Sequence, residues 1–263
     1  MKLFFKLFIP IVCFGFGFGL CVGMRCKHDM ISDFILRPQS TKSDTSFRIH
    51  PNLHANLYNP DSIQYDIWET IMQFLTKNEI SCTELTFSDG GTVNLNINNS
   101  NLSDLDTITS LALNNLDIAN TKVTNLWPLS DMSTLTGLNI KNTKIKDLEA
   151  LIDLPIRGIN MSDTLVTNII HLSKLPLHIL FMDNTLVLDL SPITNMPLSR
   201  LSFLNVAVTN LEVLTNMKGT RIDFTPQLYT KNQIEWLATT KLGIINGVPR
   251  EYWLEFCSKN DLK

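Results

Sequence analysis

The sequence predicts an α/β solenoid, in which short repeats stack to form a parallel sheet on the concave side. Short 3₁₀ or helical turns are expected on the convex side, and a helical cap at each end. Three observations predict this fold: a 21- or 22-residue period across the middle of the 263-residue chain, apolar residues at fixed positions within each period, and amphipathic or aromatic-rich segments on both sides of it. A stack of repeats has open ends, and such ends need caps.

The period is carried by apolar residues at positions 1, 3, 8, 11, 14 and 17 of each repeat. All 36 of these positions are apolar in a chain that is 44% hydrophobic, and chance would produce such a match with a probability below about 10⁻⁹. The period is therefore a structural repeat. The six repeats begin at Leu95, Leu116, Leu138, Ile159, Leu180 and Leu201.

The spacing within one repeat predicts its structure. The segment from Leu135 to Ile145 reads L-x-x-L-x-I-x-x-T-x-I, which matches the leucine-rich-repeat template. Leu138 and Ile140 alternate with a period of two, which indicates a short strand. The later apolar residues recur every three positions, which indicates a 3₁₀ or short helical turn. One repeat cannot bury its own apolar edge, so the repeats must stack.

Two polar columns accompany the apolar ones. At position 6 we expect buried hydroxyl groups that satisfy backbone groups between turns. At position 10 we expect side chains that cap the convex turns by accepting free N–H groups, which explains a row of carboxylates better than calcium binding does. Position 6 holds Ser100, Thr121, Thr143, Thr164 and Thr185, and position 10 holds Asp104, Asn125, Asp147, Asn168, Asp189 and Asn210.

Residues 1–24 are expected to be a signal peptide or a signal anchor. Lys2 and Lys6 precede an uncharged run of eighteen residues, 7–24. A basic start followed by an apolar run is typical of secretory signals, and the length also meets the lower limit of roughly 17 residues for a membrane span. Cleavage and retention both remain open, and N-terminal sequencing of fractionated cells would decide between them.

The rest of the chain divides into four predicted parts. Residues 25–60 form a linker, 61–84 an N-terminal helical cap, 85–225 the solenoid and 226–263 a C-terminal cap. In the first cap, apolar residues recur every four positions from Ile63 to Leu75. The second cap opens with Thr230-x-x-Gln233, a capping-box pattern, and carries aromatic residues that can close the end of the stack.

Two segments resemble bacterial leucine-rich-repeat proteins. The first runs from Thr185 to Leu198, and the second is the ending Asn246-Gly-x-Pro-x-x-Tyr-Trp253. In that family, short 21–22-residue repeats occur alone behind a signal sequence or fused to serine/threonine protein kinases, and the internalins are more distant relatives. The resemblance implies an extracytoplasmic interaction module. This chain contains no kinase motif, so only that module carries over.

The chain offers little that points to catalysis. It has no phosphate-binding loop, nucleophile elbow, H-E-x-x-H or C-x-x-C motif. We therefore expect no enzyme activity, no cofactor and no metal site; an enzyme with catalytic groups within 27–94 is the less favoured reading. The net charge of −3, without a run of Lys or Arg, argues against nucleic-acid binding.

The predicted function is a non-catalytic, monomeric protein-binding module outside the cytoplasm, with its ligand on the concave face. Two alternatives remain open: an internalin-like surface adhesin, and a component of a complex that residues 7–24 hold in the membrane. The partner, the source organism and the biological process cannot be read from the sequence.

The predicted partner-binding residues lie on two neighbouring strands. Most side chains that flank the inward positions are small and polar, but two strands change character. Phe181 and Leu204 are expected to form an exposed apolar centre outside the core columns, with Asp183 and Arg200 at its rim. The candidate site residues are Ile179, Phe181, Asp183, Arg200 and Leu204.

Overall fold

The computed structural model describes residues 48–49, 63–80, 84–87 and 92–260. The predicted targeting segment, 1–24, lies outside the described residues, as does nearly all of the predicted linker, 25–60. The boundaries predicted for these two segments therefore stay predictions.

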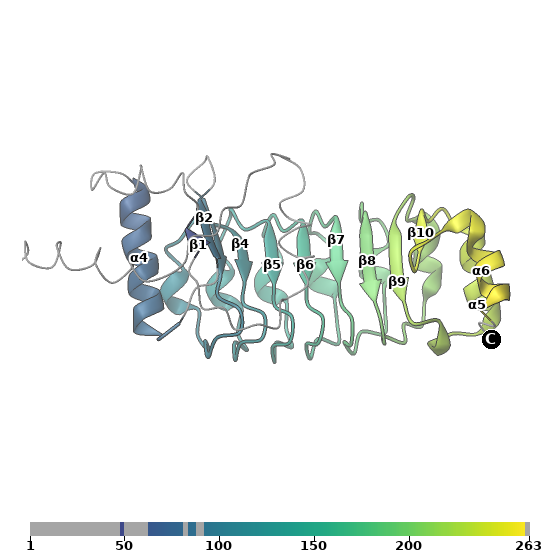
Figure 1. The fold of residues 1–263 in the computed structure, drawn as a ribbon, viewed down its shortest axis with the longest axis horizontal. Coiled ribbons are helices and arrows are strands. Elements are labelled where there is room, and N and C mark those ends of the chain that lie inside the picture. Colours follow the sequence, from purple (N-terminus) through teal and green to yellow (C-terminus); the bar gives the residue numbers. More distant parts are fainter. Residues whose placement is uncertain (1–47, 50–62, 81–83, 88–91, 261–263) are drawn as a thin grey trace, which may run out of the picture. The chain divides into compact units, whose positions relative to one another are not determined.

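The described residues form one eleven-stranded sheet whose strands follow one another in chain order (Figure 1). The strands from β3 to β10 are parallel, and antiparallel pairs occur at β2–β3 and β10–β11. In the repeats, the first-position residues lie in register, as Leu138, Ile159 and Leu180 do. The strands are β1 (Arg48–Ile49), β2 (Glu84–Phe87), β3 (Val93–Asn96), β4 (Leu113–Asp117), β5 (Gly137–Asn139), β6 (Gly158–Asn160), β7 (Ile179–Phe181), β8 (Arg200–Phe203), β9 (Arg221–Phe224), β10 (Ile244–Ile245) and β11 (Val248–Pro249).

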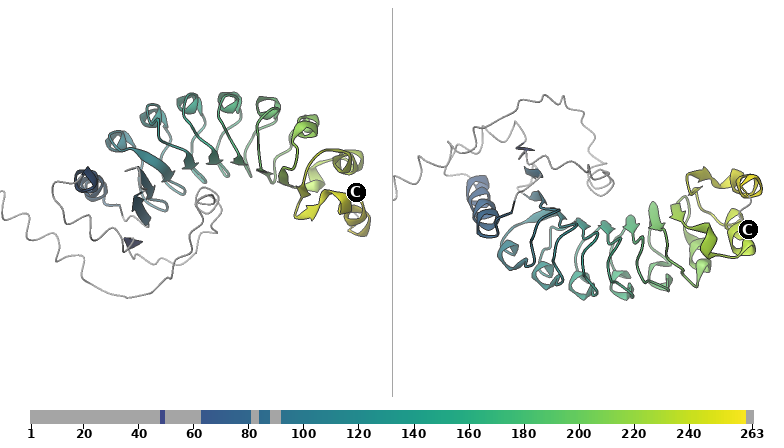
Figure 2. Two further views of the ribbon diagram at one scale, coloured as in Figure 1. Left: turned by 90° about the horizontal axis from the view of Figure 1, so that it is seen from above. Right: turned by 60° about the horizontal axis from the view of Figure 1, so that its bottom comes forward.

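One 3₁₀ turn per repeat lines the side opposite the sheet. In Figure 2 the strands line the inner side of a curved row, and the 3₁₀ turns line its outer side. The turns are η3 (Asp106–Ile108), η4 (Trp127–Leu129), η5 (Glu149–Leu151), η6 (Ile170–Leu172), η7 (Ser191–Ile193) and η8 (Leu211–Asn216). The predicted fold class, a leucine-rich-repeat solenoid with a concave parallel sheet, is confirmed.

Helices lie at both ends of the stack. On the N-terminal side this is α4 (Ile63–Lys77), whose Ile71 and Phe74 join the common core. On the C-terminal side, the predicted capping box of Thr230 and Gln233 is present at the start of α5. The elements of that end are η9 (Pro226–Leu228), α5 (Lys231–Trp236), η10 (Leu237–Thr239), η11 (Arg250–Tyr252) and α6 (Trp253–Lys259).

Trp253 closes the apolar core at the C-terminal end. Its side chain is fully buried, and its ring stacks on Phe256 with centroids 5.6 Å apart and tilts against Phe224 at 6.2 Å. Its indole N–H donates to the carbonyl oxygen of Ile234 at 2.8 Å. The ring therefore covers the last repeat while its one polar group stays satisfied.

The core contains all six apolar columns. None of their 36 side chains is more than 8% exposed. Because each repeat buries its columns against those of its neighbours, the core is continuous along the stack.

The position-6 hydroxyls are buried, except that of Ser100, which is half-buried, but they do not bridge between turns as predicted. Each donates to the carbonyl three residues earlier in its own repeat, at 2.7–2.8 Å. Thr143 donates to Ile140 and Thr164 to Met161. In its hydroxyl donations, this column satisfies the backbone of the bend after each strand within its own repeat.

The position-10 residues cap the convex turns, as predicted. From Asp104 to Asp189, each Oδ1 accepts the backbone N–H two residues on, at 2.7–3.0 Å. Asn210 departs from the pattern because its Oδ1 accepts from Leu190 in the preceding repeat.

A third polar column, at position 5, was missed by the sequence analysis. Its residues all have a positive φ, between 52° and 59°, in the left-handed region that Asn and Asp tolerate better than other non-glycine residues. Their side chains also bond between repeats: Asn142 donates to Asn120 at 2.7 Å, and Asn205 to Asn184 at 2.8 Å. We call Asn99, Asn120, Asn142, Asp163, Asn184 and Asn205 the Asx column.

The position-6 hydroxyls give a test of this account. Thr143→Val and Thr164→Val keep the side-chain volume but remove a donor from two buried carbonyl groups, which costs about 1–3 kcal/mol each. We expect the double variant to unfold at a clearly lower urea concentration than the wild type. Thr194→Val is the matched control, since Thr194 makes the same local bond to Ser191 at an exposed site. Equal midpoints for all three proteins would contradict the account.

Candidate functional site

On the N-terminal part of the concave face, from β3 to β6, side chains at the strand ends accept hydrogen bonds from the backbone. In four successive repeats the last residue of the strand accepts the N–H two residues on. For Asp117, Asn139 and Asn160 these bonds measure 2.9, 3.2 and 3.1 Å, and all three side chains are buried. Asn96 does the same for Asn98 at 3.2 Å. These acceptors hold the strand ends and are not free to activate a substrate.

This pattern ends at β7, where Phe181 stands at the corresponding position. Phe181 is only 6% exposed, whereas Leu204 on the next repeat is 39% exposed and Ile179 is half-buried. The expectation that Phe181 forms an exposed apolar centre is therefore wrong. A Phe181→Asp change would place a carboxylate in a buried site, so it cannot be treated as neutral for stability.

For β7, the backbone N–H two residues after Phe181, that of Asp183, donates to the Ser162 hydroxyl at 3.1 Å. Asp183 in turn is the acceptor for the next strand. Its Oδ1 accepts from the Ser202 hydroxyl at 2.5 Å and from the Leu204 backbone N–H at 2.8 Å. Burial raises the pKa of this carboxyl above its ordinary value, although the two hydrogen bonds act in the opposite direction. Asp183 thus holds the end of the next strand instead of forming a free charged rim.

Arg200 lies over Phe181. Its guanidinium carbon is 5.0 Å from the ring centroid, within range of a cation–π interaction. One terminal nitrogen is 3.6 Å from a carboxylate oxygen of Asp223, which also accepts from Arg221 at 3.1 Å. Within the described part of the chain, the buried Nε of Arg200 has no hydrogen-bond partner. The two guanidinium groups share one carboxylate, and Arg200 keeps a donor unused.

The structure therefore brings the five predicted residues onto neighbouring strands but assigns them different tasks. Sequence reasoning missed Arg221 and Asp223 because the repeat count stopped at the sixth repeat. The register supplies the signal: Arg221 pairs with Arg200 and Asp223 with Ser202 across β8 and β9. Arg221 and Asp223 thus continue the same face by one strand.

The described histidines and cysteine lie outside the strands of the sheet. No group of three or more metal-ligating side chains occurs among the described residues. His171 is 3.4 Å from Asp147, His178 contacts the carbonyl of Pro176, and neither lies on a strand of the sheet. Cys257 is buried in α6, where burial raises the pKa of its thiol. In the described part of the chain, none of the helices has both the length and the apolar character needed to cross a bilayer.

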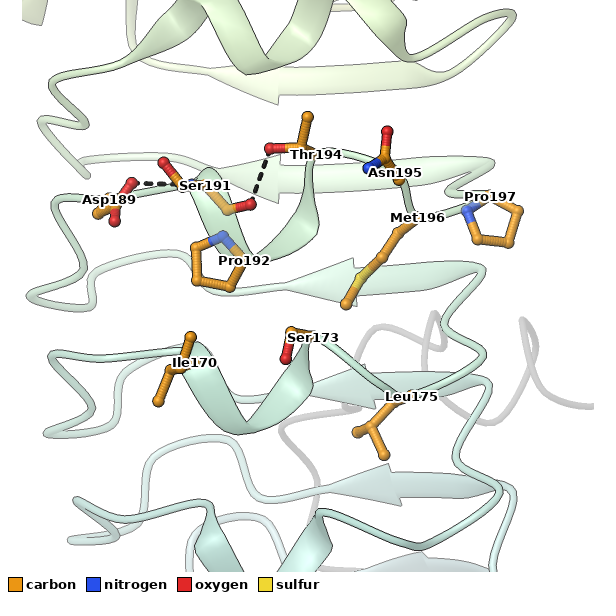
Figure 3. Close-up of a pocket in the computed structure, with 10 residues that line it drawn as sticks. All are labelled: Ile170, Ser173, Leu175, Asp189, Ser191, Pro192, Thr194, Asn195, Met196 and Pro197. Carbon is orange, nitrogen blue, oxygen red and sulfur yellow. Dashed lines mark hydrogen bonds between the residues drawn. The ribbon is translucent and has the colours of Figure 1, made fainter.

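An open pocket lies on the opposite, convex side, between η6 and η7 (Figure 3). Ile170, Pro192 and Met196 contribute apolar surface to it. Asp189 is the only titratable residue in the lining; hydrogen bonds from Ser191 lower its pKa, so its carboxylate is occupied as a cap. The pocket has no pair of groups for acid–base or nucleophilic chemistry.

The opposite pKa shifts of Asp183 and Asp189 give a test. Because the folded-state pKa of Asp183 is raised, the folded protein holds this proton more tightly, and stability falls as pH rises from below 3.8 through the raised value. For Asp189 the pKa is lowered, so its stabilising effect is present above 3.8 and is lost as pH falls through the lowered value.

The measurement is urea unfolding at a series of acidic pH values. Relative to Asp183→Asn, the wild type should lose stability as pH rises from 3.8 to the raised pKa of Asp183. Relative to Asp189→Asn, the wild type should gain stability as pH rises from the lowered pKa of Asp189 to 3.8. Two slopes of the same sign would contradict the described environments.

Similarity to known proteins is found among solved structures. No family model and no curated protein matches the chain. Among solved structures, the chain is similar to internalin C2 of Listeria monocytogenes (18% identity, TM-score 0.49, covering 60% of this chain and 80% of that one). It is also similar to the internalin inlF of the same species (22% identity, TM-score 0.48, covering 62% of this chain and 52% of that one). A third similar structure is a leucine-rich-repeat protein of Leptospira interrogans (20% identity, TM-score 0.46, covering 52% of this chain and 38% of that one).

These neighbours are two internalins and one leucine-rich-repeat protein. The chain spans about half or less of the length of the second and third. The repeats, register and convex turns of the chain itself identify its fold as a leucine-rich-repeat solenoid.

Proposed function

We propose that this chain is a non-catalytic protein-binding module that acts outside the cytoplasm and holds its ligand on the concave face across β7, β8 and β9. The proposal rests on the change in the concave face at Phe181.

That change is the observation that carries the proposal. From β3 to β6 the Asn and Asp side chains at the ends of the strands accept backbone N–H groups. From β7 onward the face offers an exposed leucine, Leu204, and the partly exposed side chain of Arg200, 29% of which is accessible. Arginine is enriched among the residues that contribute most of the binding energy in protein interfaces, and the buried centre of such interfaces is mostly apolar.

We assign different roles to the five site residues. Leu204 and Ile179 provide apolar contact, and the partly exposed guanidinium group of Arg200 donates through its terminal nitrogens to an acceptor on the partner, while its Nε stays buried. Phe181 supports the guanidinium group of Arg200 from below. Asp183 fixes the backbone that carries Leu204. A partner segment with an apolar side chain next to a carbonyl or carboxylate group fits this set.

The extracytoplasmic location is supported by the sequence of residues 1–24. The basic residues Lys2 and Lys6 before the apolar run 7–24 are typical of an export signal. A surface adhesin and a membrane-held component of a complex remain the alternatives, and both use the same concave site. A monomeric state belongs to the same proposal.

The experiment is site-specific photo-crosslinking in the intact source cells. A photoreactive residue placed at Leu204 should give a discrete adduct with one protein partner, because this side chain is exposed at the centre of the proposed site. The adduct should be lost on Arg200→Gln, which removes the guanidinium donors.

The matched control is the same photoreactive residue at Ile170, which is 49% exposed on the convex side. An adduct from position 170 and none from position 204 would place the binding surface on the convex side. An adduct that forms equally well with Arg200→Gln would refute the role of Arg200.

A further inference from the structure

A second exposed surface lies along the edge formed by the turns that follow the strands. Three leucines there are among the most exposed apolar side chains of the described residues: Leu165 at 42%, Leu186 at 61% and Leu188 at 56%. They belong to positions 7 and 9 of consecutive repeats, next to the Asx column. We call these three residues the leucine edge.

The leucine edge is a continuous row because the turns are bonded to one another. The backbone N–H of Leu165 donates to the carbonyl of Ile145 at 3.0 Å, and that of Leu186 to Val166 at 3.2 Å. Neighbouring repeats of a parallel sheet lie about 4.8 Å apart, so these leucines are close enough to form one surface. In Figure 1 these turns make up the lower edge of the stack, where the strand arrows end.

Basic side chains continue the row toward the N-terminus. Lys122, Lys144 and Lys146 are exposed, and none of them has an ion pair within the described part of the chain. Across the six repeats, positions 7 and 9 contain no carboxylate. Position 7 holds Asn101, Lys122, Lys144, Leu165, Leu186 and Ala207, and position 9 holds Ser103, Thr124, Lys146, Thr167, Leu188 and Thr209.

The nearest carboxylates are already engaged. In the Asx column, Asp163 lies 3.7 Å from Lys141 and accepts from Asn184 at 2.7 Å. At position 10, Asp147 and Asp189 accept backbone N–H groups at the starts of the convex turns. The row therefore combines exposed leucines with lysines that make no ion pair within the described part of the chain.

We propose that the leucine edge and its three lysines dock on an anionic lipid surface. Leucine side chains that project from an edge can enter the boundary between headgroups and acyl chains, while lysines remain at the level of the phosphate groups and are attracted by them. A bilayer needs no complementary pocket, and the pocket described on the convex side is not lined by these leucines. This inference is independent of the proposed concave binding site.

The test is lysine footprinting by mass spectrometry on the full chain, with a neutral amine-reactive reagent. A readout at individual residues is needed because residues 7–24 could bind lipid on their own. With vesicles of phosphatidylcholine and phosphatidylglycerol, modification of Lys122, Lys144 and Lys146 should slow severalfold compared with phosphatidylcholine vesicles. Lys174 and Lys218, which are exposed beyond the convex turns, are the internal controls and should be modified at unchanged rates.

Variants separate insertion from simple charge attraction. Leu186→Ser with Leu188→Ser should remove most of the protection of Lys144 and Lys146. Ile170→Ser, which changes a comparably exposed apolar residue on a convex turn, should retain the protection. Equal modification of the three lysines with and without anionic vesicles would overturn the proposal. So would protection by soluble polyglutamate but not by vesicles, which would indicate an acidic protein partner.

Discussion

The left-handed backbone at position 5 of each repeat is the constraint on which the rest of the structure depends. Each strand must end after a few residues and turn its chain toward the convex side, and the Asx column makes that turn with φ values of 52–59°. Side-chain amides then link most of the turns, as from Asn120 to Asn99 at 2.9 Å. The link is interrupted between Asn142 and Asp163, where Lys141 lies near the carboxylate instead. The residues that adopt the left-handed backbone conformation are thus the same ones whose side chains bond between repeats.

This turn also determines which surfaces the chain can offer to partners. Residues before it alternate between the core and the concave side, where acceptors such as Asn139 and Asp183 hold the strand ends. Residues after it alternate between the core and the exposed edge that carries Leu186. Since each repeat makes the same turn, equivalent positions of successive repeats line up in columns. A change of residue type within a column therefore changes the character of the surface at that repeat. The proposed binding sites both begin where a polar column gives way to apolar residues.

The fold could be predicted from the sequence because the apolar columns depend only on the spacing of residues along the chain. Apolar residues at all 36 of the fixed positions lie far outside what chance produces. The position-10 caps were predictable for the same reason. Details that depend on a dihedral angle or a rotamer were not. The residue type of Asn142 does not determine the sign of its φ angle. The hydroxyl of Thr143 could donate to several carbonyl groups, and in the structure it donates to that of Ile140. The burial of Phe181 depends on how the sheet curves and where Arg200 lies, which the alternation of residues cannot reveal.

The most direct test of the Asx column compares the unfolding free energies of Asn142→Gly and Asn142→Ala. Asn142 is exposed, so neither change alters the core, and both remove the bond to Asn120. Glycine adopts a positive φ without strain, whereas alanine does not. We predict that Asn142→Ala is less stable than Asn142→Gly by about 1 kcal/mol, although glycine is the more flexible residue in the unfolded chain. An alanine variant as stable as the glycine variant, or more stable, would show that the left-handed turn is not the constraint that holds the repeats.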